Sequence, residues 1–221
     1  SKDQKIKPHL VESYEISKDA TVFTIHLRKG VKFHNGRELE AKDIKWNFNR
    51  ITDPKIKSKV RLRLNMAKVK VIDKYTLTFT TEKPTPAFLQ ALTQDLWSNC
   101  MLIMAPESKV NDKGVITHPI GTGPFILETD KIKQDIQVTW VKNQDYWIKG
   151  IPYLDKIVGK IIKDGETRLT ALKRGDVDLT HTINVFNGVK LIKNPLPGFT
   201  IVSRPDLGFF PAVFYNSSKP P

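Results

Sequence analysis

The sequence predicts an α/β fold with a mixed, twisted sheet in each of two segments, and three observations carry this prediction. Residues 21–33 alternate apolar and polar side chains, which is the period of a half-buried strand. Residues 41–51 repeat apolar side chains at helical spacing. Residues 157–179 follow the order strand, helix, strand. A Pro- and Gly-rich stretch at residues 118–125 separates the first two patterns from the third, so each segment is expected to hold its own sheet.

The first segment begins with a strand pair followed by a helix. Within residues 21–33 the Lys29-Gly30 pair separates two strands, and Asn35-Gly36 forms a turn. The helix that follows carries Asp43 in its first turn, where a carboxylate favours the helix dipole. Asp53-Pro54 ends this helix, because proline disfavours helical backbone in the residue before it.

The rest of the first segment predicts a second hairpin and a short helix. Residues 68–81 alternate again around an Asp73-Lys74 turn. Pro84 and Pro86 precede a short helix over residues 87–92, and residues 96–104 are expected to form a buried strand or loop.

The second segment predicts three strands before a capped helix. Residues 125–127 and 136–140 are expected to be adjacent strands, and residues 157–162 another. Asp164 is placed to cap a helix that ends at Gly175. A strand at 177–179 follows, which predicts that it pairs in parallel with 157–162 through a βαβ unit.

Composition limits the class of protein. The chain has 221 residues, 39% hydrophobic and 27% charged, which is typical of a globular protein with one or two domains. The sequence has no run of about 18 apolar residues, so it predicts no membrane span. The net charge of +13 admits nucleic-acid binding, but the lysines are spread evenly from Lys2 to Lys219 without a nucleic-acid-binding motif. We therefore expect a solvated basic surface and no nucleic-acid partner.

The sequence offers no catalytic, metal or cofactor motif. The five histidines lack metal-binding spacing, and Cys100 has no partner for a disulfide. No serine lies in a G-x-S-x-G context, and Gly121-Thr122-Gly123 lacks the third glycine of a dinucleotide fingerprint. We expect a protein that is not an enzyme, although an α/β hydrolase remains the competing class.

The stretch from His118 to Phe125 carries the clearest single signal. Two glycines one residue apart are flanked by Pro119 and Pro124 and lead into a strand. Glycine is favoured where φ is positive or where backbones approach closely. The stretch predicts a tight crossover from one globular unit into another.

Several blocks of sequence share an order that is known from one family. Together they resemble the family 5 extracellular solute-binding proteins, which are the peptide-, nickel- and oligosaccharide-capturing subunits of ABC importers. The blocks are residues 21–36, 39–44, the Gly121-Thr122-Gly123 crossover, 143–147, 152–157, 167–179 and 214–216.

The resemblance implies part of a type II periplasmic-binding-protein fold. Residues 8–118 correspond to the smaller inserted lobe of the family. Residues 119–216 correspond to part of the larger N-terminal lobe and end at the hinge to a C-terminal lobe. The family's proteins are much longer, so the resemblance implies an internal piece that lacks the first strands and the C-terminal lobe. Exposed apolar surface is therefore expected on residues 119–216.

The resemblance also implies non-catalytic capture of a solute outside the membrane and its delivery to an ABC permease. A short peptide is the first expected solute, and a nickel chelate is the second. The protein is expected to be an extracytoplasmic monomer, periplasmic or lipid-anchored, without a cofactor. Its leader is not expected in this chain, because the polar start at Ser1–Lys5 is not a signal peptide.

Two regions before the crossover are expected to contact the solute. In nickel-type relatives the segment that matches residues 96–102 supplies arginines, whereas this chain has Asn99 and Leu102 at the closest positions. Trp97 offers an aromatic wall or, alternatively, a core side chain.

The second region holds Arg61 and Arg63, which could pair with a carboxylate of a peptide or chelate or could form a solvated basic edge. Tyr215 and Asn216 lie where the hinge would begin, and they either touch the ligand or order the hinge. No residue is expected to ligate a metal.

Overall fold

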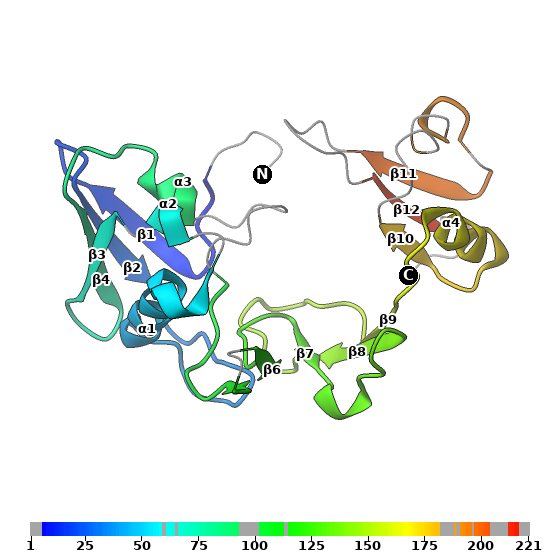
Figure 1. Cartoon of the computed structure of the whole chain (residues 1–221), viewed down its shortest axis with the longest axis horizontal. Coiled ribbons are helices and arrows are strands. Elements are labelled where there is room, and N and C mark those ends of the chain that lie inside the picture. Colours follow the sequence, from blue (N-terminus) through cyan, green and yellow to red (C-terminus); the bar gives the residue numbers. More distant parts are fainter. Residues whose placement is uncertain are drawn as a thin grey trace. The chain divides into compact units, whose positions relative to one another are not determined.

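A computed structural model describes most of the chain, and Figure 1 shows its course. The described residues are 6–58, 61–64, 66–92, 102–112, 115–181, 188, 191–195, 197–203 and 212–216. Contacts between Cα atoms divide the chain into two compact units. Unit 1 comprises Ser1–Asp130 and Thr139–Ile157, and unit 2 comprises Lys131–Val138 and Val158–Pro221. The assignment of residues 8–118 and 119–216 to two lobes of a longer protein stays a prediction.

A four-stranded antiparallel sheet forms the centre of unit 1. Its strand order is β1-β2-β4-β3, with bounds β1 Val11–Ile16, β2 Val22–Leu27, β4 Thr76–Thr81 and β3 Ala67–Val71. Phe23 lies opposite Phe79, and Ile25 opposite Leu77, so the apolar side chains of neighbouring strands share one face. The predicted strand after Lys29-Gly30 is wrong, because the turn at Asn35-Gly36 leaves only an isolated bridge between Lys32 and Glu38.

Helices accompany the sheet in unit 1 (Figure 1). They are α1 Ala41–Thr52, the 3₁₀ turn η1 Pro54–Ile56, α2 Arg61–Leu64 and α3 Phe88–Leu92. Side chains from all three α-helices join one buried cluster with the inner face of the sheet. The helical members of the cluster are Ala41, Ile44, Phe48, Leu64, Phe88 and Leu89. The predicted helices at 41–51 and 87–92 and the hairpin at 68–81 are therefore confirmed.

Helix α1 begins and ends where the sequence predicts. The Asp43 carboxylate accepts a hydrogen bond from the Glu40 N–H at 2.9 Å, which satisfies one free donor at the helix start. At the other end the Asp53 N–H donates to the carbonyls of Asn49 and Arg50 before Pro54 stops the helix.

The chain beyond α3 completes unit 1 with short strands. Strand β5 (Lys109–Val110) pairs with β6 (Ile116–His118), and β7 (Phe125–Leu127) pairs with β8 (Gln137–Lys142), both antiparallel. The η2 turn (Thr129–Lys131) lies between β7 and β8. The expected adjacency of the strands near 125 and 140 is confirmed. Strands β8 and β9 (Lys156–Lys160) each include residues of both units.

Unit 2 contains helix α4 and a three-stranded sheet. Helix α4 spans Gly165–Arg174, and the sheet has the order β10-β12-β11, with β10 Leu179–His181, β12 Ala212–Asn216 and β11 Phe199–Ser203. The predicted βαβ unit is wrong. Strand β10 pairs with β12 in antiparallel orientation, and β9 is not a strand of that sheet.

Apolar side chains are exposed along residues 119–216 but also before them, for example at Leu62 and Ile72, so the expected surface for missing strands stays a prediction. Ile136, Tyr153 and Leu179 each have more than half of their surface exposed. No helix in the part of the chain that the structure describes is long and apolar enough to cross a membrane.

Candidate ligand-facing segments

Helix α2 places one candidate arginine at the surface of unit 1. Leu64 is completely buried in the core and fixes the rotation of this single helical turn, whereas Leu62 is 73% exposed. Arg61 is partly buried, and its Nε atom, which is closed to solvent, has no hydrogen-bond partner among the described residues. A guanidinium that is partly removed from water favours a carboxylate beside its exposed atoms. The backbone of Arg63 belongs to α2, but its side chain lies outside the described set.

The second predicted segment is described only from Leu102 onward. Trp97 and Asn99 lie outside the described residues. Leu102 is 55% exposed, whereas Met104, two residues later, is only 7% exposed. The chain therefore passes from solvent into the core over two residues.

The crossover at residues 120–123 is bound to the turn that contains His34. The Gly121 N–H donates to His34 Nδ1 at 3.3 Å, and His34 Nε2 lies 3.0 Å from the Gly123 carbonyl oxygen. The His34 N–H in turn donates to the Gly121 carbonyl at 2.8 Å. Burial lowers the pKa of His34, although the bond to Gly123 acts in the opposite direction. His34 is thus half-buried rather than the exposed loop residue that its place beside Asn35-Gly36 suggests.

The two crossover glycines correct a second expectation. Neither Gly121 nor Gly123 has a positive φ, whereas Gly30 and Gly36 do. A Cβ atom on Gly121 would lie 3.4 Å from His34 Cε1, and one on Gly123 would meet only the Phe125 carbonyl oxygen, at 4.0 Å. A Cβ at position 121 would be in ordinary contact with the His34 ring and one at position 123 would have space, so neither left-handed backbone nor close backbone approach explains these glycines, and the expectation is wrong.

Tyr215 and Asn216 belong to β12 in unit 2. Asn216 lies opposite Phe199, and Tyr215 opposite both Thr200 and Leu179. Their side chains are outside the described set. Arg61 and Leu102 belong to unit 1. One binding site that includes all the predicted contact residues therefore stays a prediction. These residues are Arg61, Arg63, Trp97, Asn99, Leu102, Tyr215 and Asn216.

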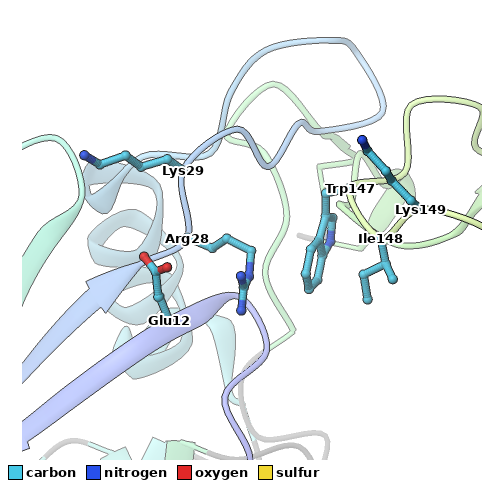
Figure 2. Close-up of a pocket in the computed structure, with 6 residues that line it drawn as sticks. All are labelled: Glu12, Arg28, Lys29, Trp147, Ile148 and Lys149. Atoms are coloured by element: carbon cyan, nitrogen blue, oxygen red, sulfur yellow. The ribbon is translucent and has the colours of Figure 1, made fainter.

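Figure 2 shows a pocket in unit 1 that the sequence did not indicate. It is open and has a volume of about 700 Å³. Its lining residues are Glu12, Arg28, Lys29, Trp147, Ile148 and Lys149.

Two of the lining side chains, Arg28 and Trp147, contact each other and His9. The Arg28 guanidinium lies 5.2 Å from the centre of the Trp147 ring, and His9 contacts the same ring edge-on at 4.9 Å. Arg28 Nε also donates to the His9 carbonyl at 3.2 Å. Burial, and next the charge of Arg28, lower the pKa of His9. Because His9, Arg28 and Trp147 already contact one another, we assign them a structural role. They join the N-terminal segment, the end of β2 and the loop after β8.

The sequence placed Asp43 in the first turn of the helix but indicated neither its burial nor its partner, and it gave no role to Asn47. Asp43 is almost fully buried and receives two hydrogen bonds from Arg37, at 2.9 and 3.0 Å. Asn47, also buried, binds the backbone of Met104. The available signal was their position beside Ile44 and Phe48 on the apolar side of α1. In the described ranges, no group of three or more His, Cys, Asp or Glu side chains could hold a metal ion.

Comparisons with known proteins give one consistent result. A family model for bacterial extracellular solute-binding proteins, family 5 Middle, matches residues 5–221. The glutathione-binding protein GsiB of Salmonella typhimurium strain LT2 is 33% identical over 195 residues, which is 87% of this chain and 37% of GsiB.

Solved structures agree with this match. DppA from Helicobacter pylori in complex with the peptide STSA has a TM-score of 0.71 and 30% identity, over 90% of this chain and 42% of DppA. NikA from Brucella suis in complex with Fe(III)-EDTA has a TM-score of 0.77 and 27% identity, over 93% of this chain and 41% of NikA. These neighbours have the type II periplasmic-binding-protein fold, and this chain spans about two fifths of their length.

Proposed function

Because the chain belongs to the family 5 bacterial extracellular solute-binding proteins, we propose that it contributes to capturing a small solute outside the cell membrane and presenting it to an ABC permease. The family is extracytoplasmic and not enzymatic, so we assign the chain no catalytic role. In two-lobed receptors the lobes close around the ligand by a hinge motion. The permease can then recognise the closed, ligand-bound form rather than the open one. We expect the chain to act as a monomer in this process.

A short peptide is the solute that we propose. DppA is described with a peptide and GsiB is named for glutathione, which supports this choice. The observation on this chain that carries it is the partly buried guanidinium of Arg61, whose enclosed Nε atom has no acceptor among the described residues. A peptide's terminal carboxylate would bind the exposed part of this guanidinium in a charge-assisted hydrogen bond. Leu62, next to Arg61 in the chain, and Leu102 are both exposed and would offer apolar contact to the peptide's side chains.

A metal chelate is the second candidate, favoured by the match to NikA with Fe(III)-EDTA. The chelate's own ligands would hold the metal. Arg61 would then pair with a carboxylate of the chelator rather than with a peptide terminus.

The test is a titration of the isotope-labelled 221-residue chain followed by NMR of backbone amides. The probes are glutathione, the peptide STSA, the same peptide with an amidated C-terminus, and a nickel–histidine complex. We expect the free-acid peptides to shift the amides of Arg61–Leu64 and Leu102–Ala105 with weak affinity, because the chain spans only about two fifths of its relatives.

Two variants sharpen this test. Arg61→Gln should weaken peptide binding about tenfold, since a charge-assisted hydrogen bond contributes about 1.5–3 kcal/mol. Lys55→Gln, which removes an exposed cation from η1, should leave it unchanged. A response to nickel–histidine alone would favour the chelate. No response to any probe, or an equal response in both variants, would contradict the proposed ligand contact.

A further inference from the structure

Asn47 makes an unusual set of contacts for a helical side chain. It lies in the middle of α1 and is only 2% exposed. Its Nδ2 donates to the Met104 carbonyl at 2.8 Å, and its Oδ1 accepts from the Met104 N–H at 3.2 Å. The amide thus binds both backbone groups of one residue, as a neighbouring strand residue would.

The remaining donor of the Asn47 amide is also used. Its second Nδ2 hydrogen is directed to the carbonyl of Asp43, one turn earlier in α1, at 2.9 Å. The side chain therefore cannot rotate without breaking hydrogen bonds to both α1 and Met104 in a site that excludes water.

The segment that Asn47 binds is fixed from the other side as well. The Ala105 N–H donates to the Ile120 carbonyl at 2.8 Å, and the Ile120 N–H donates to Ser108 Oγ at 3.0 Å. Residues 104–105 consequently lie between α1 and the start of the crossover. The hydrogen bonds to Asn47 occur where the chain changes from exposed, at Leu102, to buried, at Met104.

We propose that Asn47 is a positioning residue that sets the place of Leu102 relative to α1 by fixing the Met104 backbone. Its relevance to solute capture rests on the proposed function, because Leu102 is the described member of the predicted ligand segment. The physical claim about position does not depend on any ligand. Alanine at position 47 would remove the only partners that the described residues give to the two Met104 backbone groups, whereas the inner face of the sheet would keep its apolar contacts.

The test is hydrogen exchange of the 221-residue chain, resolved to single amides, in the wild type, Asn47→Ala and Asn49→Ala. Asn49 is an exposed asparagine on the same helix and serves as the matched control. In Asn47→Ala we expect the Met104 and Ala105 amides to exchange about ten times faster or more, with little change at Phe23 or Phe79 in the sheet. Asn49→Ala should match the wild type.

Two results would overturn the proposal. One is unchanged exchange at Met104 in Asn47→Ala, and the other is an equal rise at Met104, Phe23 and Phe79, which would show general destabilisation. If Asn47→Ala does not fold, the wild type still decides. A Met104 amide that exchanges as fast as in an unfolded chain contradicts the proposal, and one protected like the amides of α1 supports it. Titration with glutathione is scored separately, because a missing response there tests the proposed function alone.

Discussion

Single polar side chains fix the backbone of unit 1 at several places. His34 is the clearest, because each ring nitrogen has a backbone partner in the crossover. Nδ1 accepts the Gly121 N–H, so the proton must reside on Nε2, which donates to the Gly123 carbonyl. This neutral tautomer is the form that burial favours, and protonation of Nδ1 would remove the bond to Gly121.

His34 therefore predicts a loss of stability on acidification. Burial lowers the pKa of His34 below its ordinary value of about 6.5. The unfolded chain then takes up the proton first, so the contribution of His34 is complete above about pH 6.5 and is lost as the pH falls below it. Urea unfolding at pH 7.5, 6.5 and 5.5 should show a smaller decrease in the free energy of unfolding for His34→Gln than for the wild type. Parallel pH profiles for the two proteins would count against this assignment.

Arg37 makes two ion pairs that should differ in strength. It binds the buried Asp43 with two hydrogen bonds and the half-exposed Glu107 at 2.9 Å. Asp43→Asn should reduce the free energy of unfolding by about 3 kcal/mol, because it leaves a partly buried guanidinium without its charged partner. Glu107→Gln should cost less than about 1 kcal/mol, because solvent screens that pair. Chemical denaturation of both variants checks the ranking, and equal losses would refute it.

Helix α4 shows that chemistry at an element's ends is readable from sequence. Asp164 caps its start by accepting the Thr167 N–H at 2.8 Å, and Gly175 ends it with a φ of 78°. Both were predicted, because each depends on residues within one turn. The pairing of strands on either side of α4 was not predictable in this way. Periodicity identifies a strand but not its partner, and the partner of β10, β12, lies more than 30 residues later.

The caps of α4 give a prediction at this scale. Asp164→Ala should lower the free energy of unfolding of unit 2, because the Thr167 N–H loses its acceptor. Gly175→Ala should cost about 1 kcal/mol or more, because alanine is strained at this φ. Glu166→Gln, which keeps the cap, is the control. Exchange of the α4 amides measures all three, and equal rates in the cap variants and the control would exclude the capping argument.

The two units differ in length, with 149 residues in unit 1 and 72 in unit 2, and a shorter unit buries a smaller fraction of its surface. In the described residues, unit 1 has one cluster that joins its sheet to three helices, whereas the cluster of unit 2 has three buried members, Leu169, Leu172 and Leu191. A small core contributes little against the entropy of ordering the chain. Unit 2 is therefore expected to be the less stable of the two.

Hydrogen exchange tests this difference directly. Amides of β2 and β4 should exchange more slowly than those of α4 and β11, because they open only when the larger core unfolds. Leu77→Ala should speed exchange within unit 1 but leave the amides of α4 unchanged. Leu77 and the buried leucines of α4 belong to separate clusters. A single common rate for both units, in the wild type and the variant, would show that they unfold together.

At the scale of the whole molecule, the sequence predicted the fold class and the family better than the site. Blocks of residues in a fixed order identify a family even when each block is weak. A binding site depends on which distant side chains converge, and periodicity carries no such information. Asn47 and His34 illustrate this limit, because their partners lie 57 and 87 or 89 residues away.

The interleaving of the two units along the chain constrains how the protein can be made and recombined. Synthesis delivers the N-terminus first, so residues 131–138 of unit 2 emerge before residues 139–157, which unit 1 needs. The Ile136 carbonyl accepts a hydrogen bond from the Ile161 N–H at 2.8 Å, and this bond cannot form until Ile161 has been synthesised. Unit 1 cannot be complete until Ile157 has been added. A chimera with a single junction between two parent proteins would divide at least one unit between them, wherever the junction lies. Transferring unit 2 intact requires two separate stretches, residues 131–138 and 158–221.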